Sequence, residues 1–365
     1  MHPTRVIFSR PSDKVSMMPN SAPPVNQSYK PIQQTVLVTG AAGFIGSHAA
    51  EALLDRGYEV VGVDNFSDFY DRSWKEANLK CVGGGLKLEE LDIADGPRIA
   101  ALISKLKPVA ILHLAAMAGV RPSIERPAHY CRVNIEGTAN LLQAAVENKV
   151  GKFLFASSSS VYGNASRVPF SEEDPVDEPI SPYAATKRSG ELLSHTFWHL
   201  YKLPIFCLRF FTVFGPRQRP DLAIHKFTRL ITDGKPIPVF GDGSTSRDYT
   251  FVEDIVAGIM SALDHCDRYR IYNLGGNDPV TLKSLIEGIE IAIGRKAIIQ
   301  RQPTQPGDVE RTYADLTRSK AELGYQPRTS MAEGLKKFAE WFKDYAHLYP
   351  TPLKKPSSIQ LTTDN

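Results

Sequence analysis

A phenol and an ammonium group lie four residues apart at Tyr183 and Lys187. Positions i and i+4 of a helix share one face, so both side chains would point into one site. Ser181 is suited to cap the start of such a helix, and Pro182 is suited to its first turn. The helix dipole and the Lys187 charge would then favour the phenolate and lower the pKa of Tyr183, which would make this tyrosine a base near neutral pH.

The same spacing also fits an amphipathic helix with a buried ring and a solvated lysine, and so short a motif recurs by chance. The catalytic interpretation therefore depends on what the rest of the chain places beside this pair. A cofactor site and a third polar group would favour it.

A glycine-rich turn follows the first apolar run of the chain. Residues 35–39 have strand character, GAAGFIG follows at 40–46, and a helical pattern comes next. A strand, such a turn and a helix N-terminus together form a dinucleotide-phosphate site. The next strand ends in Asp64, 24 residues after Gly40, where a carboxylate binds the ribose hydroxyls and repels a 2′-phosphate. NAD is therefore predicted rather than NADP, although Asp64 could instead cap a turn with Asn65.

Strand and helix patterns continue to alternate. We expect strands at 59–64, 86–91, 109–114 and 152–156, and a long helix at 134–148. Small residues after the fourth strand, at 115–119, would let a cofactor lie against the backbone. The alternation predicts an α/β protein with a Rossmann-type doubly wound parallel sheet, followed by a smaller C-terminal α/β substrate lobe.

Four consecutive serines at 157–160 follow the fifth strand. Their hydroxyls would lie above the sheet, near the nicotinamide end of the cofactor, and could hold a substrate oxygen. Serines at a strand end also bond their own backbone, and for any one of the four this alternative stays open. Only their position relative to Tyr183 can distinguish the two roles.

Composition narrows the function classes. The 365 residues carry 43 basic and 40 acidic side chains, a balance that argues against nucleic acid or an anionic membrane as a partner. No apolar run approaches the roughly 20 residues that span a bilayer. Four scattered cysteines without zinc-ligand spacing predict no metal site and reduced, mostly buried thiols in a cytoplasmic protein. They are Cys81, Cys131, Cys207 and Cys266.

Longer motifs occur in a fixed order: TGAAGFIG at 39–46, HLAA at 113–116, SSSSVYG at 157–163 and YAATK at 183–187. With these motifs the chain, from about residue 35 to 345, resembles the nucleotide-sugar epimerases of the extended short-chain dehydrogenase/reductase superfamily. Further stretches look like the UDP-glucuronate 4-epimerase subfamily: DNF at 64–66, LRFFTVFGP at 208–216, SRDY at 246–249 and QPGDV at 305–309.

The resemblance implies roles for individual residues. Tyr183 and Lys187 match the catalytic pair, and Ser158 matches the catalytic hydroxyl, a role that Ser159 or Ser160 could share. The substrate positions implied are Ser158, Thr212 and Arg219 near the sugar, Arg247 at the UDP phosphates, and Asp308. The NAD positions implied are Gly40, Gly43, Phe44, Ile45, Gly46, Asp64, Asn65, Asp92, Ile93, Leu114, Ala115, Ala116, Asn134, Tyr183, Lys187 and Phe211.

The resemblance also implies a reaction. Tyr183 would take the proton from the C4 hydroxyl of a UDP-hexose while the C4 hydride passes to NAD, and Ser158 would hold the oxygen of the 4-keto sugar. Lys187 would bind the nicotinamide ribose. Return of the hydride to the opposite face would convert UDP-glucuronate to UDP-galacturonate without net redox change, so the enzyme would be an isomerase.

Related enzymes use the same keto sugar differently. Dehydratases of the superfamily carry Asp-Glu after the catalytic threonine, and UDP-glucuronate decarboxylases carry a Glu before Val-Tyr-Gly, where this chain has Ser159 and Ser160. The missing carboxyl groups favour epimerisation. A UDP-glucose/UDP-galactose 4-epimerase, a decarboxylase and a non-catalytic NAD or nucleotide-sugar sensor remain alternatives. A C6 carboxylate needs a cation, which Arg217 or Arg219 could supply if it is not a solvated loop charge.

The domain organisation follows from these elements. We expect a disordered lead at 1–34 and an NAD-binding Rossmann domain at 35–210, with return segments at about 249–275. A UDP-sugar-binding lobe at 211–248 and 276–345 and a flexible tail at 346–365 complete the chain. His225 is expected to be a surface or packing histidine rather than a base. By analogy with the superfamily, helices near 134–148 and 181–201 would form a homodimer.

Overall fold

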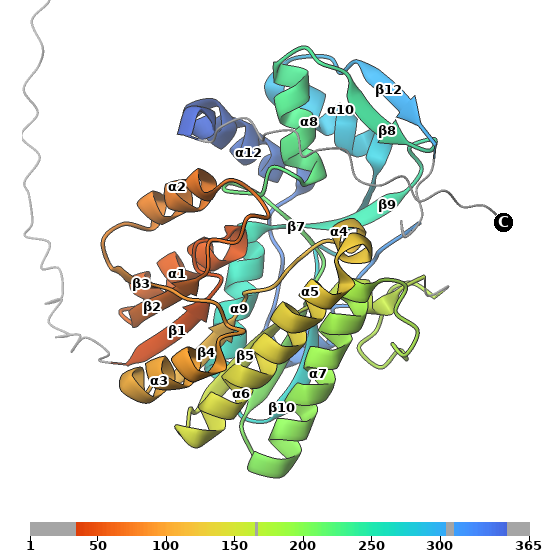
Figure 1. Ribbon diagram of the computed structural model, residues 1–365. Coiled ribbons are helices and arrows are strands. Elements are labelled where there is room, and N and C mark those ends of the chain that lie inside the picture. Colours follow the sequence, from red (N-terminus) through yellow and green to blue (C-terminus); the bar gives the residue numbers. More distant parts are fainter. Residues whose placement is uncertain (1–33, 165–166, 304–309, 349–365) are drawn as a thin grey trace, which may run out of the picture. The chain divides into compact units, whose positions relative to one another are not determined.

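The computed structural model describes residues 34–164, 167–303 and 310–348. The predictions for the lead before residue 34 and for the tail after residue 348 lie outside these residues. A seven-stranded sheet, in which every paired strand is parallel, has the strand order β10-β6-β5-β4-β1-β2-β3 (Figure 1). Its strands are β1 (Thr35–Thr39), β2 (Glu59–Asp64), β3 (Leu86–Glu90), β4 (Ala110–His113), β5 (Lys152–Ser158), β6 (Ile205–Phe210) and β10 (Tyr269–Leu274).

The central strand β1 shows why these runs are apolar throughout. Val36 and Val38 belong to one buried cluster and Leu37 to another, because alternate side chains of a strand point to opposite faces. Both faces are therefore covered, as parallel sheets require. The predicted doubly wound α/β fold is confirmed.

Two groups of helices cover the two faces (Figure 1). The helices α1 (Phe44–Asp55) and α9 (Val252–His265) pack on one face. The helices α3 (Gly96–Leu106), α6 (Gly137–Glu147) and α7 (Pro182–Tyr201) pack on the other. Shorter elements join them: α2 (Arg72–Val82), α4 (Val120–Glu125), α5 (Pro127–Cys131), η1 (Arg132–Glu136) and η2 (Ser159–Tyr162). The predicted helix at 134–148 thus begins in the π-helical turn η1.

A second set of elements, drawn at the top of Figure 1, builds a smaller lobe with two small sheets, β11-β9-β7 and β12-β8. Its core contains Phe227, Leu285 and Phe338. The elements after β6, apart from α9 and β10, are β7 (Thr212–Phe214), α8 (Ala223–Thr232), β8 (Ile237–Phe240), β9 (Ser246–Phe251), β11 (Pro279–Thr281), α10 (Leu282–Ile293), β12 (Ile299–Gln302), α11 (Thr317–Leu323), α12 (Met331–Tyr345) and η3 (Ala346–Leu348).

Two segments differ from the expected domain bounds. Tyr249 lies in β9, which pairs with β7 of the lobe, so the return to the large sheet begins with α9. The helix α11, expected in the lobe, instead contacts β10 and α9, because Leu323 is buried in the core of the large sheet. The remaining division into a cofactor domain and a sugar lobe stays a prediction.

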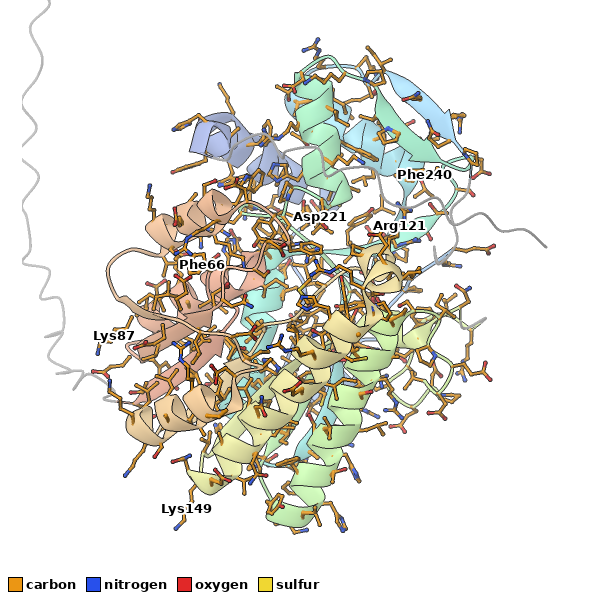
Figure 2. All side chains as sticks on the ribbon, viewed as in Figure 1. Phe66, Lys87, Arg121, Lys149, Asp221 and Phe240 are labelled. Carbon is orange, nitrogen blue, oxygen red and sulfur yellow. The ribbon has the colours of Figure 1, made fainter. Side chains whose placement is uncertain are left out.

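Aromatic side chains join the lobe to the elements around the large sheet. The Arg121 guanidinium of α4 lies 5.0 Å from the ring centroid of Phe240 in β8 (Figure 2). Trp74 of α2 lies 4.9 Å, centroid to centroid, from His225 of α8. His225 is buried in this cluster and burial lowers its pKa to about 4, which confirms its predicted packing role.

All four cysteines are free thiols. Cys207 and Cys266 are buried, but Cys81 is half-buried and Cys131 is exposed, so the expectation of mostly buried thiols holds for only two of them. Within 34–164, 167–303 and 310–348, no helix has the length and apolar character needed to cross a membrane.

Candidate active site

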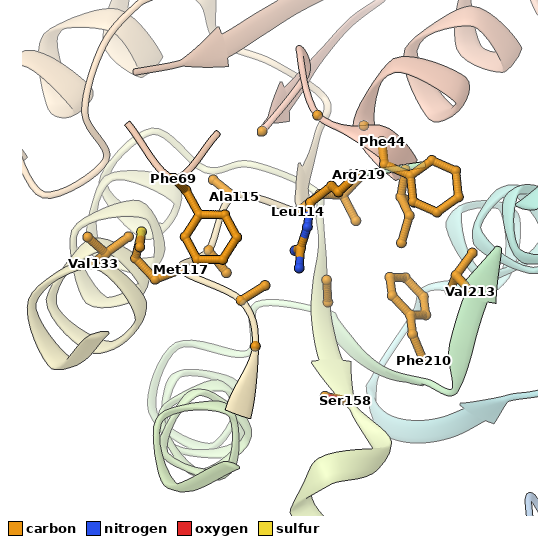
Figure 3. A pocket seen from close by; sticks show the side chains of 18 of the residues that line it. Phe44, Phe69, Leu114, Ala115, Met117, Val133, Ser158, Phe210, Val213 and Arg219 are labelled. Atoms are coloured by element: carbon orange, nitrogen blue, oxygen red, sulfur yellow. The ribbon is translucent and has the colours of Figure 1, made fainter. Parts of the chain in front are cut away.

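A cleft of about 380 Å³ opens where the strands of the large sheet end. Gly40, Asp64, Leu114 and Ser158 line it, and each lies at or just beyond the carboxyl end of a strand. This edge is where open parallel sheets bind ligands. Figure 3 shows apolar side chains around the cleft and the Arg219 side chain extending into it.

The helix α7 begins where the sequence predicts. The Ser181 Oγ accepts a hydrogen bond from the backbone N of Ala184 at 3.1 Å, and Pro182 is the first helical residue. Tyr183 in the first turn and Lys187 one turn later both line the cleft, and Ser158 at the end of β5 lines it as well. The structure therefore brings the three predicted catalytic side chains together.

Of the four consecutive serines, Ser158 is the one that acts on the Tyr183 phenol. Its Oγ lies 3.1 Å from Ser160 Oγ and accepts from the Ser160 backbone N at 3.1 Å. When its single O–H turns to Tyr183 instead of Ser160, it acts to lower the pKa of that phenol. Ser157 instead donates to the buried Glu191 carboxylate at 2.7 Å. Position relative to Tyr183, which the sequence left open, thus favours Ser158.

The predicted low pKa of Tyr183 is wrong for the protein alone. Burial raises the pKa of this phenol, and the opposing effects of Ser158 and Arg219 are smaller. Lys187 does not reverse the shift, because its Nζ donates to Ala156 O at 2.7 Å and lies 6.0 Å from the Tyr183 ring centroid. Burial lowers the pKa of Lys187 itself to about 7, against the raising effect of Glu191.

The glycine-rich turn leaves room and donors for a dinucleotide phosphate. A Cβ on Gly46 would lie 2.0 Å from Gly40 O, and Gly40 has a φ of +72° with a Cβ position 2.8 Å from Ala115 N. Side chains are therefore excluded here. In the described residues no side chain caps α1, and its first turn carries no acidic residue. The first N–H groups of a helix lack intrahelical partners, so an anion fits this end of α1.

Asp64 is bonded to a lysine that sequence reasoning missed. Lys75 Nζ lies 2.8 Å from the Asp64 carboxylate, both side chains are buried, and both line the cleft. The carboxylate also accepts from the backbone N of Phe66 at 2.9 Å. Lys75 belongs to α2 and follows Asp64 by 11 residues in the chain. The helix places the lysine side chain over the end of β2.

Most predicted cofactor residues line the cleft, but Asp92 and Asn134 are not among the described lining residues. The Asp92 carboxylate accepts from Ala94 N at 2.9 Å, between the lining residues Leu91 and Ile93. The Asn134 amide bonds the backbone N and O of Met117 at 2.8 and 2.9 Å. Asn134 thus shapes the turn after β4 from behind and does not face the cleft.

Of the predicted substrate residues, some line the cleft and others do not. Thr212 and Arg219 line the cleft. Arg219 donates from Nε and Nη2 to the two carboxylate oxygens of Asp221 at 2.9 and 2.7 Å, and its guanidinium lies 5.1 Å from the Phe69 ring centroid. Burial opposes the charged guanidinium, but Asp221 outweighs this effect and raises the pKa of Arg219.

Two other arginines lie away from the described cleft lining. Arg217 Nη2 donates to Glu51 at 2.6 Å, so this arginine, one of two candidates for a carboxylate partner, is already paired. Arg247 Nη1 donates to Ser246 O at 2.9 Å. The prediction for Asp308 falls outside the described residues.

Sequence reasoning also missed Phe69 and Tyr70, which line the cleft beside Arg219. They belong to the loop between β2 and α2, where DNF at 64–66 and DFYD at 68–71 both resemble the subfamily. That match was the available signal, but it assigned no role to the two rings.

The comparisons with known proteins agree with this geometry. The sequence model of a family described as GDP-mannose 4,6 dehydratase matches residues 37–338. The chain belongs to this family. Membership confirms the predicted place in the extended short-chain dehydrogenase/reductase superfamily. The description of the family names a dehydratase activity.

Several of the similar proteins are named as epimerases. UDP-glucuronate 4-epimerase 3 of Arabidopsis thaliana is 43% identical over 335 residues, which cover 85% of this chain and 77% of that protein. The Bacillus cereus UDP-glucuronic acid 4-epimerase, solved with UDP-glucuronic acid and NAD, is 35% identical with a TM-score of 0.80, covering 85% of this chain and 99% of that one. The Thermotoga maritima UDP-glucose 4-epimerase, solved with UDP-glucose, is 33% identical with a TM-score of 0.80, covering 86% of this chain and 100% of that one.

Proposed function

We propose that this chain is an NAD-dependent UDP-sugar 4-epimerase that converts UDP-glucuronate to UDP-galacturonate. The observation that carries the proposal is the meeting of Ser158, Tyr183 and Lys187 in one cleft into which the Arg219 guanidinium extends. The Arabidopsis and Bacillus relatives, whose names specify UDP-glucuronate, support this choice of sugar.

The cleft fits NAD. The pyrophosphate would lie on the uncapped N-terminus of α1 over Gly43 and Gly46, and the adenosine ribose would lie at Asp64 and Lys75. Phe211 and the small residues Ala115 and Ala116 would border the remainder. When bound, NAD supplies the hydride acceptor, and its positively charged nicotinamide favours a phenolate nearby.

Each catalytic side chain has a distinct task. Tyr183 Oη takes the proton of the sugar C4 hydroxyl as the C4 hydride leaves, and returns it when the hydride is delivered to the other face. The Ser158 hydroxyl donates to the C4 oxygen and stabilises the carbonyl of the 4-keto sugar. Lys187, fixed by its hydrogen bond to Ala156 O, holds the nicotinamide ribose and contributes positive charge.

The choice of sugar falls to Thr212 and Arg219. Asp221 occupies two of the five N–H donors of Arg219, which leaves the others for a carboxylate at C6. Asp221 therefore fixes the plane of the guanidinium without using all of its donors.

The lining of the cleft also argues against dehydration and decarboxylation. Among the described residues that line it, Asp64 is the single carboxylate, and it lies at the proposed adenosine end. Ser159 and Ser160 stand where related dehydratases and decarboxylases carry acidic residues. No described carboxyl group is therefore placed to remove water or to assist loss of carbon dioxide.

The test is to incubate the purified protein with UDP-glucuronate and no added reductant, and to identify the products by mass spectrometry and chromatography. UDP-galacturonate is expected, and the Tyr183→Phe variant should form none while retaining NAD. UDP-xylose with carbon dioxide would support a decarboxylase, and interconversion of UDP-glucose and UDP-galactose alone would support the alternative epimerase. Binding without any turnover would support a sensor.

We further propose a homodimer in the cytoplasm. The helix α7 exposes large apolar side chains at Leu192, Leu200 and Tyr201, which a second copy would cover. The four free cysteines support a reducing compartment. Light scattering of the purified protein would test the dimer.

A further inference from the structure

The loop at 215–219 carries Arg219 from β7 toward α8 and is tied to the cofactor helix α1 at two consecutive residues. His48 Nε2 lies 3.0 Å from Pro216 O, and the Arg217 guanidinium donates to Glu51 at 2.6 Å. His48 and Glu51 are three residues apart on α1, so they share the face that meets the loop. The same helix begins at the glycine-rich turn proposed to hold the NAD pyrophosphate.

The electrostatics of these two contacts favour a stable connection between the loop and α1. Burial, helped by the Arg217 charge, lowers the pKa of His48 to about 3, so the ring is neutral at physiological pH and its Nε2–H can donate to the Pro216 carbonyl. The Arg217 and Glu51 side chains are 10% and 38% exposed. An ion pair that is partly withdrawn from water is screened less than a surface pair.

The backbone conformation of Arg217 gives its ion pair with Glu51 a structural role in the loop. Its φ is +64°, a left-handed conformation that a non-glycine residue adopts at a cost. The loop therefore depends on contacts that hold it in place. The bond from Arg217 to Glu51 acts directly at the strained residue, two positions before Arg219.

The other side of the loop is fixed from the lobe. Gln218 Nε2 donates to Val213 O at 3.1 Å, and Gln218 O lies 2.7 Å from His225 Nδ1. Arg219, the next residue, extends into the cleft and bonds Asp221. The loop is thus held between α8 on one side and α1 on the other.

We propose that His48 and Glu51 are positioning residues for substrate recognition. By fixing the backbone at Pro216 and Arg217, they direct Arg219 toward the C6 carboxylate of the sugar. They also connect α1, the helix proposed to hold the NAD pyrophosphate, to Arg219, the residue proposed to recognise the substrate. The inference rests on the proposed function, because it assigns Arg219 the C6 carboxylate.

The test compares two ligands that differ at C6. Calorimetry on the NAD-loaded protein would measure the affinity for UDP-glucuronate and for UDP-glucose in the wild type and in Glu51→Gln. We expect UDP-glucuronate to bind about tenfold more weakly to the variant and UDP-glucose to change less than about threefold. Arg217→Gln should give the same pattern, and the double variant should add little, because both substitutions break one interaction.

A matched control is available on the same helix. Arg56 at the end of α1 pairs with Asp264 of α9 at 3.1 Å, with exposures of 39% and 50%, away from the loop. Asp264→Asn should leave both affinities unchanged. A general effect of weakening α1 would appear in this control and in the NAD content.

The outcomes separate the two proposals. An unchanged UDP-glucuronate affinity in both Glu51→Gln and Arg217→Gln, or an equal loss for both ligands, would overturn the positioning role while leaving the proposed function intact. A wild type that binds the two UDP-sugars equally well, with Arg219→Gln indistinguishable from it, would overturn the proposed choice of sugar and this inference with it.

Discussion

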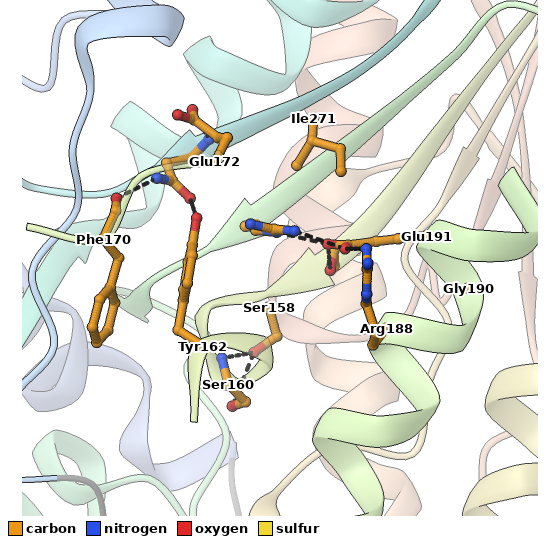
Figure 4. Close-up of polar contacts among 12 residues, drawn as sticks. Ser158, Ser160, Tyr162, Phe170, Glu172, Arg188, Gly190, Glu191 and Ile271 are labelled. Atoms are coloured by element: carbon orange, nitrogen blue, oxygen red, sulfur yellow. Dashed lines mark hydrogen bonds and ion pairs between the residues drawn. The ribbon is translucent and has the colours of Figure 1, made fainter. Parts of the chain in front are cut away.

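The Glu191 carboxylate accepts hydrogen bonds from Arg209 at 2.8 and 2.9 Å, and the two side chains are 0% and 1% exposed. Glu191 lies one helical turn after Lys187 on α7 and also accepts from Ser157 of β5 at 2.7 Å. Figure 4 shows Glu191 beside Arg188, which donates to the same carboxylate at 3.2 Å. The strand that ends at Ser158 and the helix that carries Tyr183 are therefore joined through one carboxylate.

Glu191→Gln should change both stability and pH dependence. It leaves Arg209 buried without a charge partner, which should lower the free energy of unfolding by about 3 kcal/mol. It also removes the charge that raises the Lys187 pKa, so this pKa should fall below about 7. Because the proposed mechanism uses the charged Lys187 ammonium, the alkaline limb of kcat/KM should move to lower pH.

Denaturant unfolding and a pH–rate profile would check these expectations. Arg188→Gln is the matched control, because Arg188 also donates to Glu191, at 3.2 Å, but its loss leaves the carboxylate charge in place. An alkaline limb that does not move in Glu191→Gln would contradict the electrostatic role of Glu191.

Lys187→Met should stabilise the protein while removing turnover. The Lys187 pKa is about 7 in the folded protein against an ordinary value of 10.5, so the unfolded chain binds more protons between these values. The cost of burying the ammonium is therefore complete below pH 7 and disappears by about pH 10.5. The stability gain of the variant over the wild type should be largest at pH 6, at a few kcal/mol, and should shrink toward pH 10.

Unfolding in urea at several pH values would measure this difference. A constant difference between the two proteins from pH 6 to pH 10 would show that Lys187 is not held at a depressed pKa.

Local signals were sufficient to predict much of the fold and part of the site. The turn at 40–46, the acid at Asp64 and the helix start at Ser181 each depend on neighbours in sequence, and each lies where predicted. The parallel sheet follows from the alternation of apolar strands and helices. Such features need no knowledge of distant contacts.

The features that could not be predicted depend on distant partners. Arg217 and Arg219 were both candidates for a carboxylate partner, and the pairing of Arg217 with Glu51, 166 residues earlier, could not be inferred from the sequence. Asn134 is directed to Met117 by a turn whose shape the sequence does not specify. The sign of the Tyr183 pKa shift depends on how deeply the ring is buried, and the sequence at 181–187 does not reveal that burial.

Asp64→Asn should weaken the preference for NAD over NADP. In the wild type the Asp64 charge both repels a 2′-phosphate and neutralises Lys75 at 2.8 Å. The variant frees the buried ammonium to pair with that phosphate, so NADP affinity should rise about tenfold and NAD affinity should fall by a similar factor. Fluorescence titration with both dinucleotides would measure the change, and Lys75→Met in the same background should cancel the gain for NADP.

Arg219 should decide between glucuronate and glucose through geometry as well as charge. Arg219→Gln removes the cation and should lower kcat/KM for UDP-glucuronate by about tenfold to a hundredfold, equivalent to one charged hydrogen-bonded contact, while activity with UDP-glucose should be nearly unchanged. Arg219→Lys keeps the charge but loses the planar fork that Asp221 holds through two N–H groups. Its loss should therefore be intermediate, whereas a full recovery in the lysine variant would mean that a point charge suffices and that the orientation imposed by Asp221 is unnecessary.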